Sequence, residues 1–146
     1  MASFKFTHQF DQMDCGPACI QMIAANYGKD YPLSYLRNLS HLSRDGVSVL
    51  GIRNALNKIG LVSATYEMTL QQLQEMCPFP AILHWEQNHF VVLYGVKFRR
   101  LKNTREYYVA NPAFGKTKLS EEDFSRSWLN GDKGVVIAIE PTANFY

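Results

Sequence analysis

The chain has 146 residues, of which 47% are hydrophobic and 19% are charged. That is long enough for one domain with its own core, and the balance excludes a disordered chain. The formal net charge of +2 is too small to indicate nucleic-acid binding.

The cysteines indicate a reducing compartment. Cys15, Cys19 and Cys77 give an odd count, and the first two would lie one turn apart on a helix, a poor geometry for a disulfide. No apolar run follows the first charged residue, as it would in a signal peptide, and no segment approaches about 18 continuous apolar residues. We expect a soluble, cytosolic domain that does not itself cross a membrane.

A cysteine stands near the start of the first predicted helix. Gly16 and Pro17 follow Cys15, and the chain is apolar and helix-competent from Ala18 to Tyr27, with Gly28 as the expected C-terminal cap. Unpaired backbone N–H groups and the positive end of the helix dipole would face the thiol. Both effects should lower the pKa of Cys15 and favour the nucleophilic thiolate.

Helical signals continue through the first half of the chain. We expect a short helix through Leu39, a turn at 44–46, a helix capped by Ser48 that Gly60 ends, a strand over 61–68 and a short helix capped by Thr69.

Beyond Pro80 strand signals take over. They predict strands over 81–85, 89–98, 105–110 and 135–140, the first two joined by a tight turn into an antiparallel hairpin, and a helix starting at Ser120. Helices followed by a largely antiparallel sheet define an α+β fold, with an N-terminal helical half packed against a C-terminal sheet.

A cysteine nucleophile needs a general base within hydrogen-bond reach and a third group that orients this base. Of the four histidines, we expect His89 to be the base, because the apolar strand that follows it would hold it rigidly. His84 is the alternative base. His8 lies near the nucleophile in sequence, and His41 lies in a polar context at a helix end.

The orienting group should be an Asp or Asn at a strand end near His89. Asn111 ends a predicted strand, although an Asn-Pro pair is also an ordinary turn. An oxyanion hole needs a side-chain donor beside the backbone N–H of Cys15, and Gln9 and Gln12 are the candidates.

Together these residues resemble the bacteriocin-processing leader peptidases, the peptidase domains of peptidase-containing ABC transporters. The similarity covers essentially the whole chain and rests on three ordered blocks: Gln9 with Cys15-Gly16 and Ala18-Cys19; Asn88 to Val92; and Ala110 to Ala113 with Gly115. It implies that Gln9 is the oxyanion donor, Cys15 the nucleophile and His89 the base, and it gives Gln12 no role. The family usually has aspartate where this chain has Asn111. We expect Asn111 to accept the proton on one ring nitrogen of His89 and to leave the other for Cys15.

The resemblance also implies a papain-like cysteine peptidase fold and a specific task. Such domains remove the leader of a secreted peptide precursor after a small pair, typically Gly-Gly, before an attached transporter exports the product. They use a narrow channel for the small residues and a shallow apolar groove for an amphipathic leader helix. Tyr27, Leu36 and Met68 are candidates for that groove, although each would also suit the core.

The resemblance further predicts the context of the chain. Residues 1–146 would be a single leader-peptidase domain, the N-terminal cytosolic domain of a longer ABC transporter; a free-standing peptidase is the alternative. It would lie on the cytoplasmic side of the bacterial inner membrane, beside the transmembrane and ATPase domains of the parent protein. We expect no cofactor in this domain, because ATP would bind only to the nucleotide-binding domain of the transporter.

Three alternatives remain open at this stage. The chain could be a non-catalytic docking domain that binds the secretion substrate for the transporter without cutting it, although such domains typically lack the nucleophile. A metal site built from Cys15, Cys19 and histidines is disfavoured, because the spacings match no recognised zinc site. Another papain-like reaction, such as acyl transfer to an amine, would use the same residues.

Overall fold

The computed structural model describes residues 4–9, 14–40, 48–86 and 88–146. Their strands form one sheet with the order β1-β6-β2-β3-β4-β5, in which every described pairing is antiparallel. The strands are β1 Leu61–Met68, β2 Ala81–Trp85, β3 His89–Arg99, β4 Thr104–Asn111, β5 Gly115–Ser120 and β6 Gly134–Pro141. The predicted α+β class is confirmed, with one strand of the first half, β1, at an edge of the sheet.

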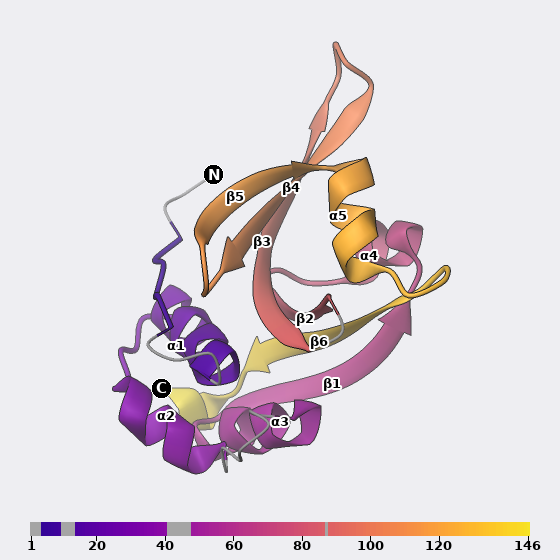
Figure 1. Ribbon diagram of the computed structural model, residues 1–146. Helices are drawn as coiled ribbons and strands as arrows, with labels where there is room; N and C mark the ends of the chain where they lie inside the picture. Colours follow the sequence, from indigo (N-terminus) through magenta and orange to yellow (C-terminus); the bar gives the residue numbers. More distant parts are fainter. Residues whose placement is uncertain (1–3, 10–13, 41–47, 87) are drawn as a thin grey trace.

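The helices lie in two groups (Figure 1). Three gather at the end of the sheet where β1 begins: α1 Cys15–Asn26, α2 Leu33–Leu39 and α3 Val49–Lys58. Two further helices, α4 Leu70–Met76 and α5 Glu121–Trp128, lie apart from them toward the other end. The predicted N-caps are present, because the side chains of Ser48, Thr69 and Ser120 each accept a bond from a backbone N–H of the first turn.

Alternate residues of the central strands feed two apolar cores. Ile82 and Val92 join the core that contains α1, α2 and α3, whereas Leu83 and Val91 join the core that contains Phe124 of α5. This alternation is what a strand buried on both faces requires, since successive side chains point to opposite sides. Helix α1 packs against β3, and this contact brings the start of the helix to the start of the strand.

Two local features differ from the sequence predictions. Strand β5 was not expected, because it is an edge strand whose residues are mostly exposed and its segment lacks the apolar alternation that marks a half-buried strand. Helix α1 begins at Cys15, so that Pro17, expected at the first helical position, is its third residue. Proline is tolerated there because the first four N–H groups of a helix have no partner within the helix.

The last described segment closes over the end of α3. The short 3₁₀ helix η2 (Ala143–Phe145) buries Phe145 completely, and both the backbone N–H and the hydroxyl of Thr142 donate to the carbonyl oxygen of Gly60, at 3.0 and 2.6 Å. Gly60 has a φ of +91°, and a Cβ there would lie 2.4 Å from the backbone nitrogen of Phe145.

Gly60→Ala should therefore destabilise the fold more than Gly28→Ala does. Gly28 has a similar φ of +98°, but a Cβ there would meet nothing within 4 Å. Gly28→Ala should cost about 1 kcal/mol through left-handed backbone strain alone, and Gly60→Ala about 2 kcal/mol more through the added clash. Urea unfolding measures both, and equal losses would contradict a close contact at Gly60.

Within the described residues, no helix combines the length and the apolar character needed to span a membrane.

Candidate active site

Cys15 occupies the first residue of α1 and is 7% exposed. The backbone N–H groups of Cys15, of Gly16 and of Phe90 on β3 lie near its sulfur and favour its negative form. Phe90 is the immediate neighbour of His89. The contact between α1 and β3 thus places the thiol beside the first residues of the strand that carries the predicted base.

The predicted lowering of the thiol pKa is wrong for Cys15 in this environment. Burial raises the pKa above its ordinary value, and the three backbone N–H groups lower it by less; the carboxylate of Asp14 raises it further. Sequence reasoning counted the helix N-terminus but not the removal of the sulfur from water. Forming the thiolate therefore needs a nearby positive charge, which a protonated imidazole would supply.

His89 and Asn111 are joined by a hydrogen bond of 2.8 Å between Nε2 of the ring and Oδ1 of the amide. The backbone N–H of Ala113 donates to the same oxygen at 3.0 Å. Because an N–H can only donate, Ala113 identifies that atom as the amide oxygen, and Nε2 of His89 must carry the proton. In the neutral ring Nδ1 is then the basic nitrogen. The contact agrees with the expectation that Asn111 accepts a hydrogen bond from one ring nitrogen of His89 and leaves the other free for Cys15.

Asn111 ends β4 and is 8% exposed, so its bond to His89 is sheltered from water. The bond of Ala113 to Asn111 comes from the turn that the Asn-Pro pair begins. Ala113 was included in the third sequence block but was given no role; the turn that an Asn-Pro pair can form was the signal that could have found this role.

Gln9 lies next to this pair. Its backbone N–H donates to the carbonyl oxygen of Pro112 at 3.0 Å, and its side-chain Oε1 is buried without a hydrogen-bond partner among the described residues. The structure thus brings Gln9, Cys15, His89 and Asn111 to one place. Gln9 bonds to Pro112, which follows Asn111 in the sequence, and Cys15 lies near Phe90, which follows His89. Gln12 lies outside the described residues.

The other histidines lie differently. His84 on β2 pairs with Phe90 across the strands, their ring centroids 5.2 Å apart, and it borders a cavity of about 430 Å³ that Glu86 and Arg126 also line. His8 is exposed, with its Nδ1 2.9 Å from the backbone carbonyl oxygen of Gln9. The hydrogen bond to Asn111 therefore favours His89 over His84 as the base. His41 lies outside the described residues.

The remaining cysteines are poor nucleophiles. Cys19 is completely buried, and burial raises the pKa of its thiol well above the ordinary value. Burial also raises the pKa of Cys77 to about 11. In the part of the chain that the structure describes, no group of three His, Cys, Asp or Glu side chains is arranged to hold a metal ion.

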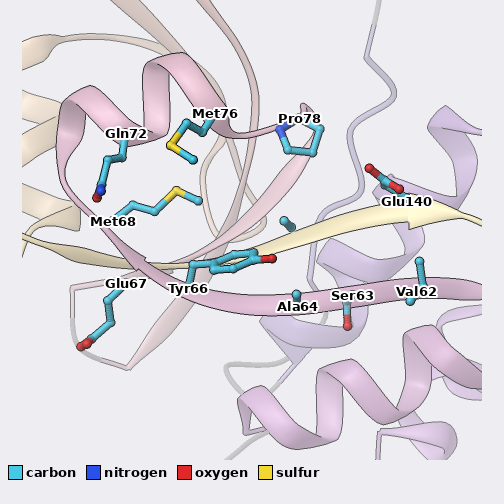
Figure 2. A pocket seen from close by; sticks show the side chains of 11 residues that line it. Val62, Ser63, Ala64, Tyr66, Glu67, Met68, Gln72, Met76, Pro78 and Glu140 are labelled. Atoms are coloured by element: carbon cyan, nitrogen blue, oxygen red, sulfur yellow. The ribbon is translucent and has the colours of Figure 1, made fainter.

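A second cavity, of about 490 Å³, lies between β1, β6 and α4 (Figure 2). Met68 and Met76 line it on the side of α4, and Tyr66 and Val62 of β1 extend it; Val62, Tyr66 and Met76 are 48–67% exposed. Of the groove candidates, Met68 borders this cavity. Leu36 does not, because it is completely buried in the core, and Tyr27 packs instead against Phe145.

Known proteins resemble this chain over nearly its whole length. A model of the Peptidase C39 family matches residues 3–144. The colicin V secretion/processing ATP-binding protein CvaB of Escherichia coli is 34% identical over 94% of the chain, and the lactococcin-G-processing and transport ATP-binding protein LagD of Lactococcus lactis is 34% identical over 97%. The chain spans only 18% and 19% of the lengths of these two proteins.

Solved structures agree with the fold. The crystal structure of a double glycine motif protease from an AMS/PCAT transporter, in complex with the leader peptide, superposes with a TM-score of 0.86 and 33% identity, covering 97% of this chain and 94% of that one. The peptidase domain of Streptococcus ComA superposes with a TM-score of 0.83 and 28% identity, covering 96% and 100%.

The fold and the site define a cysteine peptidase of the papain-like α+β class, with a helix-borne thiol beside a strand-borne histidine. Within that class the chain belongs to the Peptidase C39 family.

Proposed function

We propose that the chain removes the leader of a secreted peptide precursor by cutting after a double-glycine-type motif. The observation that carries this proposal is the likeness, at a TM-score of 0.86 over 97% of the chain, to a double glycine motif protease that holds a leader peptide. The bond between His89 and Asn111 supports it, because an orienting partner for the base is what a cysteine nucleophile requires.

In this proposal Cys15, His89, Asn111 and Gln9 act together. Nδ1 of His89 takes the thiol proton, and the sulfur attacks the carbonyl carbon that precedes the cut bond. The amide of Gln9 and the backbone N–H of Cys15 donate to the oxyanion that forms. The imidazolium then returns its proton to the leaving amine, and water releases the acyl group from Cys15 with His89 again acting as base.

The cavity between β1 and α4 is the proposed docking site for the leader. Its exposed apolar side chains, including Tyr66 and Met76, suit the apolar face of an amphipathic helix. Methionine adapts its shape easily, which favours binding of leaders that differ in sequence.

The proposed context is a longer ABC transporter. The similar proteins CvaB and LagD are secretion or transport ATP-binding proteins, several times longer than this chain. We place the chain at the N-terminal, cytoplasmic side of such a transporter in the bacterial inner membrane. The transmembrane and ATPase domains would then be its partners, and ATP would bind to the ATPase domain.

A leader cleavage assay tests the proposal directly. A synthetic leader peptide ending in Gly-Gly and followed by a short extension should be cut after the second glycine, as shown by mass spectrometry. The same peptide with Val-Val in place of Gly-Gly should stay intact, because side chains before the cut bond would clash in a narrow channel. The Cys15→Ala variant should leave both peptides intact. Failure to cut any double-glycine leader would favour a docking domain that binds without cutting.

Alkylation by iodoacetamide distinguishes the two functions without a substrate. If His89 activates Cys15, this thiol should react at least about tenfold faster than Cys77 near pH 7, since burial raises the pKa of Cys77 to about 11 and thiolates are the reactive form. Peptide mapping after brief exposure gives both rates. Equal rates would mean that Cys15 is not activated, as expected of a docking domain.

A further inference from the structure

Asp14, the residue directly before the nucleophile, is a completely buried acid. It occupies the N-cap position of α1, but its side chain makes no capping bond to the helix. Instead its two carboxylate oxygens accept bonds from Arg37 of α2, from Nε at 2.9 Å and from Nη2 at 2.7 Å. The contact joins residues 23 apart in the sequence.

This arrangement is costly unless the two groups stay together. A carboxylate without contact to water loses its hydration, and a bidentate guanidinium is the side chain best suited to replace it. Because the side chain of Arg37 is 36% exposed, its charge remains partly hydrated while that of Asp14 is not. Breaking the pair would therefore leave an uncompensated buried negative charge next to Cys15.

That charge acts on the thiol. The negative charge of Asp14 disfavours the thiolate of Cys15, in addition to the effect of burial. The cation of Arg37 acts in the opposite direction and offsets the field of the carboxylate. Among the described residues, the titratable groups that couple to the sulfur are Asp14 and Cys19. Arg37 of α2 reaches this place through its bond to Asp14, and His89, bonded to neutral Asn111, lies on β3 beside Phe90.

We propose that Asp14 and Arg37 are a positioning pair for the nucleophile, in which Arg37 holds residue 14, and with it the start of α1, and weakens the effect of the negative charge beside Cys15. Neither residue touches the scissile peptide in this role. Asp14 lies at the N-cap position of α1, and Arg37 keeps its buried charge there compatible with a thiolate. The proposal concerns the same site as the proposed function and depends on Cys15 being its nucleophile.

The pH dependence of Cys15 alkylation by iodoacetamide tests the pair without any leader peptide. Arg37→Met should move the acid limb of the profile to higher pH by about half a unit, because the unpaired Asp14 raises the thiol pKa; below the pKa this lowers the rate about threefold. Asp14→Asn should move the limb to lower pH. Arg37→Lys should bring the acid limb part of the way back to its wild-type pH, because lysine restores the positive charge but not the two parallel N–H bonds of the guanidinium.

The double variant Asp14→Asn/Arg37→Met keeps the test valid if Arg37→Met alone unfolds, because it removes both charges together. Its acid limb should lie at or below that of the wild type. Arg53→Met is the matched control: Arg53 is also partly buried, but on α3 it bonds to the neutral Ser63, and its loss should leave the profile unchanged.

A lower melting temperature in both Asp14→Asn and Arg37→Met with acid limbs at the wild-type pH would overturn the proposal and leave the pair a purely structural contact. The outcome is separable from that of the proposed function. If leader peptides are not cut but the limbs shift as expected, the pair stands and the substrate assignment fails. If cutting occurs but the limbs do not move, the pair fails alone.

Discussion

Cys15→Ala and His89→Ala should each lower kcat for leader cleavage by about 10³-fold or more, and the double variant should be no worse than the poorer single variant. The two side chains carry out one proton transfer and one attack, so either loss removes the whole step, and effects on such a unit are not additive. Single-turnover assays with a fluorescent leader peptide measure the loss.

His84→Ala is the matched control for His89. His84 lies opposite Phe90 on β2 and packs its ring against that residue, whereas the hydrogen bond to Asn111 belongs to His89. His84→Ala should keep kcat within about a few fold of the wild type, as for a residue outside the reacting groups. A loss of activity in His84→Ala with retention in His89→Ala would exchange the two assignments.

Asn111→Ala should lower kcat about tenfold to a hundredfold, the range expected when a catalytic group loses its fixed orientation. The substitution deprives Nε2 of His89 and the backbone N–H of Ala113 of their shared acceptor. The ring can then rotate, and the tautomer with a basic Nδ1 is no longer favoured. Unchanged turnover would remove Asn111 from the site.

Asn111→Asp should keep activity and change its pH dependence instead. A carboxylate offers the same acceptor to His89 and, in addition, stabilises the imidazolium, which raises the pKa of the ring. The ion pair of thiolate and imidazolium is lost when the ring deprotonates, so the alkaline limb of kcat/KM should move to higher pH. A limb that stays in place would show that the partner of His89 orients the ring without affecting its charge.

Sequence patterns predicted the parts of this molecule that depend on local signals. The caps at Ser48, Thr69 and Ser120 and the helix end at Gly28 are confirmed, because each depends on a few neighbouring residues. The histidine and asparagine that the structure joins were also predicted, since each lies at the end of a strand with a clear apolar pattern. Their catalytic roles stay predictions.

The features that the sequence did not reveal depend on packing. The raised pKa of Cys15 follows from its burial, which no local pattern encodes. The partner of Asp14 lies on another helix, 23 residues away. Leu36 was a candidate for the groove, but α2 turns it completely into the core, and helical spacing alone does not say which neighbour covers an apolar side chain.

The position of β6 within the sheet has a consequence for how the molecule acquires its shape. β6 pairs with β1 on one side and with β2 on the other. In the pairing with β1, Pro141 lies opposite Leu61, which is 80 residues earlier in the sequence. As the chain emerges from the ribosome, β1 and the hairpin of β2 and β3 are made long before the strand that unites them. Pairings over such separations are slow to form, because a long loop must close first. Until residues 134–141 are made, the edges of β1 and β2 that β6 will pair with stay unpaired. A newly made chain is most prone to aggregate during this interval.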